Sequence, residues 1–183
     1  NKAVSLVSDS SKYIKIVQAD DWLYPECLLK MVSLAESSQK IGLVSSYYLN
    51  GVDIQGSGLE YFQEVVPGSF ACELHLRKGY FMFGSPTSVL YRKEAVKDRE
   101  RLYAEGLKHE DTELAYEILM NWEFGFVHEV LSYLRKDDNS VSGVAKNYNP
   151  QALDKFIISN TYERECIKVD YEKFYKAARR KYE

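Results

Sequence analysis

The chain has 183 residues, of which 45% are hydrophobic and 14% aromatic, and its length suits one domain with a buried core. This apolar content, with a net charge of only −3, excludes a disordered chain. The surplus of acidic over basic residues, 27 against 24, disfavours a nucleic-acid-binding domain, and no apolar run reaches the roughly 18 residues of a membrane span.

The first half of the chain predicts strands that alternate with a helix, as in α/β proteins. The run YIKIV is rich in β-branched and aromatic residues and ends at a polar cluster, so it predicts a short strand. Pro25 suits a first helical turn, and apolar residues follow it at helical spacing. The elements predicted here are a strand at Tyr13–Val17, a helix beginning near Pro25, a strand at Ile41–Leu49 and a mostly irregular loop at Gly51–Gly68.

The second half continues this alternation. In its principal helix, Leu114, Ala115, Ile118 and Leu119 form an apolar stripe. The predicted elements are a strand at Thr87–Tyr91, a short charged helix at Glu94–Arg101, a helix entered through Leu107–Asp111, strands at Phe124–Val127 and Val130–Leu134, a loop at Lys136–Asn149 and a terminal helix that Asn149 and Pro150 open.

The last stretch of the chain, Tyr171–Tyr182, places five basic residues among tyrosines and Phe174. A basic amphipathic helix of this kind can lie on an anionic membrane surface. A solvated helix that packs through its aromatic residues explains the same pattern, so both interpretations stand.

Three cysteines, Cys27, Cys72 and Cys166, are too widely spaced for a C-x-x-C pair. This odd, sparse set indicates free thiols in a reducing compartment, and there is no Asn-x-Ser/Thr acceptor or signal peptide. We therefore expect a cytoplasmic protein. The chain begins at Asn1, which suggests processing or a piece of something longer.

The strongest chemical signal is Asp20-Asp21, directly after the first predicted strand. Open α/β sheets bind ligands at the carboxyl ends of their strands, and carboxylate oxygens suit Mg²⁺ or Mn²⁺ held partly by substrate phosphates. An Asx turn in which Asp20 or Asp21 caps the helix near Pro25 explains the same residues. Spacing alone does not separate the two interpretations.

The second signal is His109-Glu110-Asp111-Thr112, at the entrance to the Leu114 helix. The helix dipole stabilises an ionised carboxylate in the first turn, where it could accept a proton. Simple helix capping is the alternative. The histidines lack metal-ligand spacing, so a zinc site is not expected.

Taken in order, three segments resemble family 2 glycosyltransferases with a GT-A fold. YIKIVQADDWLYPECLLKMV (Tyr13–Val32) resembles the segment around their Asp-x-Asp-type motif, and GSPTSVLYRKEAV (Gly84–Val96) their middle segment. HEDTELAYEIL and FGFVHEVLSYLR, within His109–Arg135, resemble their Glu-Asp region and the strand pair after it. The match covers most of the chain from Asn1 to about Ser142.

The resemblance implies an α/β fold, an incomplete GT-A domain with a mixed sheet flanked by helices. It implies a partial catalytic domain at 1–149, and we expect a helical extension at 150–183. The roles that it implies are a metal ligand at Asp21, a contact to ribose or donor sugar at Asp20, a catalytic base at Asp111, the acceptor side at His109 and Glu110, a diphosphate contact at Arg135, and a site-lining stretch at Gly84 and Ser85.

The implied reaction is a single displacement with inversion, in which Asp111 activates an acceptor hydroxyl and Mn²⁺ or Mg²⁺ stabilises the departing diphosphate. The implied partners are a nucleotide-sugar donor, foremost a UDP-sugar, and a glycan or lipid-linked acceptor of cell-surface polysaccharide synthesis. Nucleic acid is not expected. We expect the Lys136–Asn149 loop to act as a lid. On the membrane-binding interpretation, the basic C-terminal helix would bring the protein to the inner face of the membrane.

Two departures from the family pattern matter. Gln18 stands where many relatives carry Asp, although the acidic pair that follows is intact. The match also covers only the C-terminal two-thirds of the family domain. We expect a chain that lacks the N-terminal part to expose an unpaired sheet edge, to bind nucleotide poorly and to self-associate or rely on a partner.

Two other functions compete with the transferase. A catalytically silent carbohydrate- or partner-binding module would keep the fold without turnover. A glycoside hydrolase would use Asp21 and Asp111 as its carboxylate pair, but it has no need of adjacent aspartates at a strand end.

Overall fold

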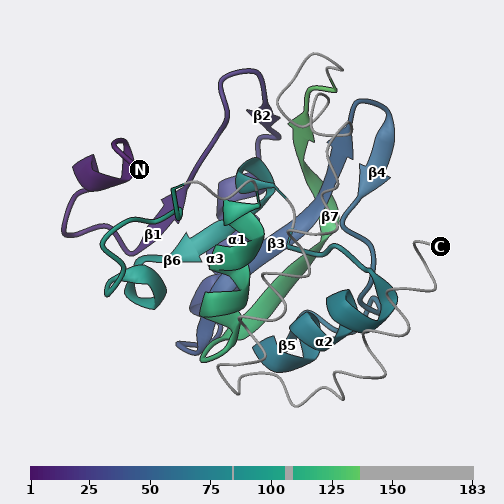
Figure 1. Ribbon diagram of the computed structural model, residues 1–183. Coiled ribbons are helices and arrows are strands. Elements are labelled where there is room, and N and C mark those ends of the chain that lie inside the picture. Colours follow the sequence, from purple (N-terminus) through teal and green to yellow (C-terminus); the bar gives the residue numbers. More distant parts are fainter. Residues whose placement is uncertain (84, 106–108, 137–183) are drawn as a thin grey trace.

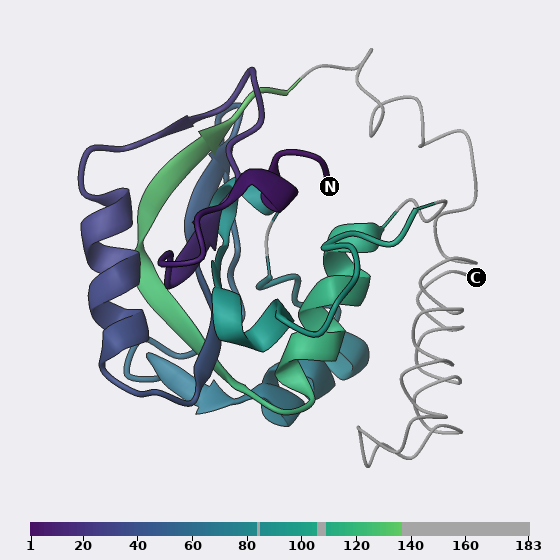
Figure 2. The same cartoon turned by 90° about the vertical axis from the view of Figure 1, so that its left-hand side faces the viewer.

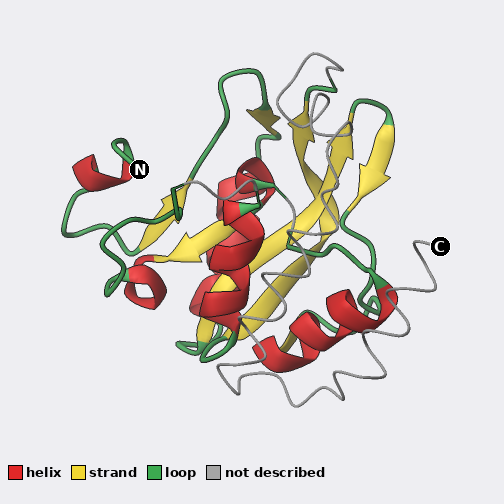
Figure 3. Ribbon diagram, in the orientation of Figure 1, coloured by secondary structure: helices red, strands yellow, loops and turns green. Residues whose placement is uncertain are grey.

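The structure is a computed structural model that describes residues 1–83, 85–105 and 109–136. Among them it contains three α-helices, seven strands and three short 3₁₀ helices (Figure 1, Figure 3). The α-helices are α1 (Cys27–Glu36), α2 (Gly68–Lys78) and α3 (Glu110–Leu119). The strands are β1 (Tyr13–Lys15), β2 (Trp22–Leu23), β3 (Ile41–Asn50), β4 (Asp53–Gln55), β5 (Val65–Pro67), β6 (Leu90–Arg92) and β7 (Glu123–Leu134). The 3₁₀ helices are η1 (Val4–Leu6), η2 (Pro86–Ser88) and η3 (Lys93–Val96).

The strands form one mixed sheet. Its order in the described residues is β1-β6-β3-β7-β2, with β4 paired to β3 and β5 paired to β7. The central strands β3 and β7 are parallel, and the other pairs are antiparallel. Because β3 and β7 run in the same direction, their carboxyl ends meet at one edge of the sheet, where α/β folds bind ligands.

Helices cover both faces of the sheet (Figure 2). On one face, α1 packs Cys27, Met31 and Ala35 into a small apolar cluster. On the other face, α3 packs a broader apolar side against the phenylalanines of β7 and the residues of α2. Because both faces of the sheet are covered, β3 consists of apolar or small residues over most of its length. The predicted mixed α/β sheet flanked by helices is confirmed.

The long strands were largely predictable, with one correction. Strands β1 and β3 match the predictions at Tyr13–Val17 and Ile41–Leu49. The two strands predicted at Phe124–Val127 and Val130–Leu134 are one strand, β7. The polar residues between them lie at a shift in the pairing with β3, so they mark an irregularity within the strand and not a turn.

The segment after Ser85 differs from the prediction at both of its elements. The strand predicted at Thr87–Tyr91 begins only at Leu90, because Thr87 belongs to η2. The helix predicted at Glu94–Arg101 shortens to η3. Beyond it Arg99 forms ion pairs with two glutamates of α3, which hold this stretch against α3 in an irregular conformation.

The predicted loop Gly51–Gly68 contains two short strands, β4 and β5, and α2 begins at its last residue. The sequence did not predict α2. At Gly68 a Cβ atom would lie 2.1 Å from the Leu119 carbonyl oxygen and 2.2 Å from that of Trp122. Only glycine therefore lets α2 begin this close to the turn between α3 and β7.

Several predictions fall outside the described residues. They are the lid beyond Lys136, the terminal helix, the basic stretch Tyr171–Tyr182 and the extension at 150–183. Within the described part of the chain, α-helices are too short or too polar to span a bilayer. Cys27 and Cys72 are buried free thiols. Strand β1 ends the strand order there, and the predicted self-association stays a prediction.

Candidate functional site

Asp21 lies at the centre of the candidate site. The chain leaves β1, turns with the Asp21 N–H donating to the Gln18 carbonyl (3.1 Å), and enters β2. The Asp21 carboxylate accepts two hydrogen bonds, at Oδ2 from the Thr87 hydroxyl (2.6 Å) and at Oδ1 from the Arg135 backbone N–H (3.0 Å). These bonds join the loop after β1 to η2 and to the end of β7, so the orientation of the carboxylate is fixed.

Asp20 and Arg135 complete an acidic and basic cluster with Asp21. Arg135 Nε donates to Asp20 Oδ2 at 3.1 Å, and both side chains are about half exposed. An ion pair this exposed contributes about 0–1 kcal/mol, so either partner can turn to a charged ligand at small cost. A guanidinium is also a good bidentate partner for phosphate. Asp20, Asp21 and Arg135, all selected from the sequence, lie together.

Thr87 is a residue of this cluster that the sequence analysis missed. It is fully buried and bonded on both sides, because its hydroxyl oxygen accepts the Gln18 N–H (3.1 Å) while the hydroxyl donates to Asp21. Gln18 therefore contributes its backbone here. The only signal in the sequence was a hydroxyl residue within Ser-Pro-Thr-Ser, which is too common to indicate a partner 66 residues away.

The alternative that Asp20 or Asp21 caps the following helix is not supported. The N-cap residue of α1 is Glu26, which makes no side-chain capping bond, and the carboxylates of Asp20 and Asp21 bond to Thr87 and Arg135 instead. The acidic pair thus has tertiary partners and does not act as a local cap.

Asp111 lies in the first turn of α3, largely enclosed by the protein. Its Oδ1 accepts the Thr112 N–H at 2.7 Å. Burial raises the pKa of its carboxyl above the usual range, more than that hydrogen bond lowers it. Burial also raises the pKa of Tyr48 and Tyr103 to about 12 and that of Tyr91 well above 10, and the Asp111 charge contributes to each of these shifts. Asp111 therefore lies near three tyrosine hydroxyls.

Asp111 and Asp21 are associated with the same end of the central strand pair. Tyr48, whose hydroxyl feels the Asp111 charge, pairs on β3 with Ser132 of β7. Three residues further along the chain, Arg135 donates its N–H to Asp21. Asp111 therefore lies on the side of Tyr48 in β3, and Asp21 is bonded at the end of β7; their places on an acceptor side and a donor side stay predictions.

His109 and Glu110 flank Asp111. His109 occupies the N-cap position of α3 and makes no side-chain capping bond. Its charge lowers the pKa of the Asp111 carboxyl, whereas the charge of Glu110 raises it. Both residues therefore lie beside Asp111, and their place on an acceptor side stays a prediction.

Ser85 precedes η2, two residues before Thr87. Its hydroxyl is buried and has no hydrogen-bond partner among the described residues. A buried hydroxyl without a partner is costly, and at a functional site it is often completed by a ligand or water. Gly84, the other residue predicted in this stretch, lies outside the described residues.

Asp20 and Asp21 supply hard oxygen ligands of the kind that Mg²⁺ and Mn²⁺ prefer. Each Asp21 oxygen accepts one of these hydrogen bonds, and a carboxylate oxygen has a second lone pair available for a cation. The described residues contain no group of three or more His, Cys, Asp or Glu side chains that could hold a metal ion. The donor set therefore fits a cation shared with ligand phosphates and not a metal centre made by protein alone.

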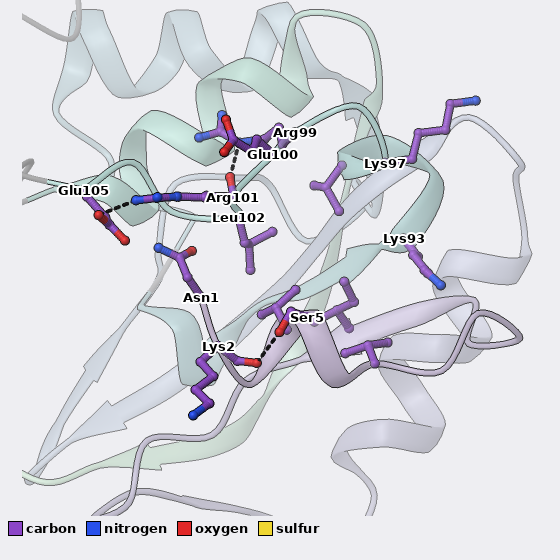
Figure 4. A pocket seen from close by; sticks show the side chains of 14 residues that line it. Asn1, Lys2, Ser5, Lys93, Lys97, Arg99, Glu100, Arg101, Leu102 and Glu105 are labelled. Atoms are coloured by element: carbon purple, nitrogen blue, oxygen red, sulfur yellow. Dashed lines mark hydrogen bonds and ion pairs between the residues drawn. The ribbon is translucent and has the colours of Figure 1, made fainter.

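A separate cavity of about 480 Å³ lies between the N-terminal segment and the stretch from Lys93 to Glu105 (Figure 4). Its lining includes several cations, among them Arg99 and Arg101. Arg99 pairs with two glutamates of α3 and Arg101 pairs with Glu105. The charges of these two arginines are therefore matched within the protein, and the cavity contains none of the candidate residues.

Comparison with known proteins supports the fold. No protein-family model matches the chain, and no curated protein matches it in sequence. The crystal structure of S. aureus TarS 1-349 is similar, with a TM-score of 0.54 and 19% identity over 74% of this chain and 38% of that one. A second crystal structure of S. aureus TarS gives a TM-score of 0.52 and 18% identity over 75% of this chain and 24% of that one.

TarS is a glycosyltransferase with a GT-A-like fold. At this level of identity the similarity establishes the fold alone, and this chain spans well under half of the TarS chains. The GT-A-like fold expected from the sequence is thereby confirmed. Membership of family 2 stays a prediction.

Proposed function

We propose that this chain forms part of a glycosyltransferase that moves a sugar from a nucleotide-sugar to an acceptor hydroxyl with inversion. One observation carries the proposal. The Asp21 carboxylate is held by Thr87 and the Arg135 N–H, and Asp20 pairs with the Arg135 guanidinium, at the carboxyl ends of the central strands in a fold shared with a glycosyltransferase. Fold similarity alone would not assign an activity, so the argument depends on these residues.

In this proposal Asp111 is the catalytic base. Its carboxylate takes the proton from the acceptor hydroxyl as that oxygen attacks the anomeric carbon. Burial raises the pKa of this carboxyl, so the ionised form is a stronger base than an exposed aspartate. General-base assistance typically contributes about 10²- to 10⁴-fold in rate. His109 and Glu110 shape the surroundings of this carboxylate on the acceptor side.

Asp20, Asp21 and Arg135 form the donor side. Asp21, held by Thr87 and by the Arg135 N–H, presents a fixed carboxylate that would hold Mn²⁺ or Mg²⁺ together with the donor diphosphate. The cation would supply charge neutralisation for the leaving nucleoside diphosphate. Asp20 would contact the ribose or donor sugar, and the Arg135 guanidinium would leave Asp20 for the diphosphate.

We further propose a UDP-sugar as donor and a glycan or lipid-linked glycan as acceptor, because the acidic pair and the arginine match a diphosphate and a cation. Ser85, with its unpartnered buried hydroxyl, is a candidate contact to the donor. The described residues say nothing of a membrane contact, so the proposed location at the inner membrane face depends on the C-terminal stretch.

The test uses the full-length protein, nucleotide-sugars and Mn²⁺. Asp21→Ala should weaken Mn²⁺-dependent donor binding in calorimetry by at least about tenfold, since the cation loses a fixed ligand. Asp111→Asn should spare donor binding and lower sugar transfer by about 10²- to 10⁴-fold. Asp9→Ala, which changes an exposed aspartate paired with Lys93 outside the site, is the control.

Unchanged transfer in both variants would refute the assigned roles. Donor binding without any transfer or hydrolysis in the wild type would favour the alternative, a silent binding module with this fold. Activity on a glycan without a nucleotide donor would instead favour a hydrolase.

A further inference from the structure

Two aromatic rings stack at the edge of the candidate site, where β2 pairs with the end of β7 (Figure 1). Trp22 and Tyr133 are a cross-strand pair, and their rings are nearly parallel, with 3.8 Å between the centroids and 6° between the planes. In the described part of the chain, the two apolar clusters of the sheet include neither ring, and Trp22 is 50% exposed. The stack therefore contributes little to the hydrophobic core, and its effect is on the strand pair that carries it.

The stack lies next to the ion pair between Asp20 and Arg135. Along paired antiparallel strands, side chains two residues apart lie on the same face, about 7 Å from one another. Asp20 is two residues before Trp22, and Arg135 is two residues after Tyr133, so the register of the stacked pair places Asp20 opposite Arg135. The 3.1 Å contact between their side chains shows that this register continues past the stack.

The backbone pairing at this edge of β7 is short. Strand β2 has only two residues, and one further bond joins the Tyr24 N–H to the Leu131 carbonyl (3.0 Å). Strands in sheets are usually about five or six residues long. On the other edge of β7, the pairing with β3 extends in the described residues only to Leu134. The stack therefore supplies side-chain contact where the backbone ladder beside Arg135 is shortest.

The position of Arg135 decides the orientation of the Asp21 carboxylate. The Arg135 N–H donates to Asp21 Oδ1 at 3.0 Å, and the Thr87 hydroxyl donates to Oδ2 at 2.6 Å. Hydrogen bonds weaken steeply as their angle and length depart from the ideal, so a small movement of the end of β7 away from β2 removes one of these two bonds. The carboxylate then loses its fixed orientation.

We propose that Trp22 and Tyr133 are positioning residues of the donor side, an inference that rests on the proposed function. Their stack keeps Arg135 beside the acidic pair, so that the Arg135 N–H orients the Asp21 carboxylate and the guanidinium stays within reach of the donor diphosphate. The rings act through Arg135 and Asp21 and do not themselves touch the ligand. A site held in this way is organised before the donor arrives, which lowers the cost of binding.

The experiment compares variants of the full-length protein that break the stack with variants that keep it. Trp22→Leu and Tyr133→Leu each remove one ring, whereas Trp22→Phe and Tyr133→Phe leave two rings to stack. The first measurement needs no ligand, because NMR hydrogen exchange of the Arg135 backbone amide reports its bond to Asp21. We expect this amide to exchange at least about tenfold faster in the leucine variants and at nearly the wild-type rate in the phenylalanine variants.

The second measurement is calorimetry of UDP binding in the presence of Mn²⁺. The leucine variants should lose about tenfold in affinity, with a melting temperature close to that of the wild type, because the stack lies outside the core. In an Asp21→Ala background, Trp22→Leu should cost less than about twofold more, since a residue that acts through Asp21 has little effect once that carboxylate is absent. The control Phe62→Leu makes the same kind of change at a ring that is 80% exposed between β4 and β5, and it should alter neither measurement.

The outcomes separate the stack from the proposed function. Unchanged exchange of the Arg135 amide in both leucine variants would overturn the positioning role, and so would a loss of UDP affinity that Trp22→Phe does not restore. Additive losses from Trp22→Leu and Asp21→Ala would show that the indole touches the ligand itself, which also overturns it. Faster exchange of Arg135 in the leucine variants, restored by phenylalanine, in a protein that binds no UDP would support the stack and refute only the donor site.

Discussion

Asp111, the proposed catalytic base, illustrates how a residue suited to catalysis can cost stability. Its carboxyl is enclosed near three tyrosines, and burial raises its pKa because the charged form loses hydration. At neutral pH the folded protein must therefore keep a charge in an unfavourable place. A base that takes a proton from a hydroxyl benefits from this environment, whereas folding does not.

The first prediction at this scale concerns Asp111→Asn. The folded chain holds the Asp111 proton more tightly than the unfolded chain, whose carboxyl has its ordinary pKa near 3.8. The wild type therefore loses stability as pH rises from about 4 through the raised pKa, and the full penalty applies at neutral pH. The uncharged asparagine avoids the penalty and can still accept the Thr112 N–H.

Urea denaturation followed by circular dichroism should show the variant about 1 kcal/mol more stable than the wild type at pH 7. The difference should shrink towards pH 4, because the wild-type carboxyl takes up a proton in the folded state as the pH falls through its raised pKa. The exposed variant Asp9→Asn should show no such gain. Equal differences at both pH values would contradict this account.

At the residue scale, the sequence identified those site residues that stand in a recognisable local pattern. Asp20 and Asp21 stood out because two carboxylates follow a strand, whereas Arg135 was named only through the family resemblance. Their contact with one another depends on the sheet, since Arg135 and Asp21 are 114 residues apart. Thr87 could not be predicted because a hydroxyl that bonds to a carboxylate looks the same in sequence as one that faces water.

At the scale of secondary-structure elements, Arg92 connects α1 to the sheet. Its buried guanidinium donates to the carbonyls of Ala35, Ser38 and Ile41, at the end of α1 and the start of β3. Its guanidinium also lies 5.2 Å from the centre of the Tyr13 ring. A cation at a helix C-terminus also interacts favourably with the helix dipole. One side chain thus joins α1, β1, β3 and β6.

Replacing Arg92 should lower the free energy of unfolding. Arg92→Met leaves two buried carbonyl groups and one partly buried carbonyl group without their donor, and we expect a loss of about 3 kcal/mol in the free energy of unfolding. The measurement is urea denaturation at pH 7. The matched control is Arg101→Met, which removes a half-exposed arginine paired with Glu105 and should change stability by less than about 1 kcal/mol. Similar effects of the two substitutions would argue against the joining role of Arg92.

Helices and strands were predictable where the spacing of apolar residues in the sequence matches the positions that pack against the sheet. The helix expected near Pro25 exists as α1, but it buries Cys27, Met31 and Ala35 and leaves Leu28 about half exposed. Apolar periodicity alone did not say which of these residues face the sheet. Helix α2 was missed because it begins at a glycine, and that glycine is required by the neighbouring carbonyls and not by any local helix signal.

At the scale of the whole molecule the two faces of the sheet are unequal. The face covered by α2 and α3 holds a large aromatic and aliphatic core, whereas the face covered by α1 holds a small cluster. Helix α1 also exposes Leu28 and Leu29 at 49% and 71%. Less buried apolar area means a smaller free energy for local opening on the α1 side.

Hydrogen exchange should report this difference. We expect the backbone amides of α1 to exchange faster than those of α3 under native conditions, because opening α1 exposes less apolar surface. Mass spectrometry of peptides that cover each helix measures both rates in one sample. Arg92→Met should accelerate exchange in α1 further while leaving α3 nearly unchanged. Faster exchange in α3 than in α1 would contradict the unequal-core description.

The bonds of Asp21 also have a consequence for biosynthesis. Its carboxylate is tied to Thr87 and Arg135, partners that emerge from the ribosome 66 and 114 residues later. The acidic pair therefore remains an ordinary pair of solvated aspartates until β7 has been synthesised and docked, and closing so long a loop is entropically expensive. Under the proposed function, a nascent polypeptide therefore has no formed site at this place for a metal ion or a sugar nucleotide. Competence for ligands arrives with the last central strand, as a property of the completed sheet.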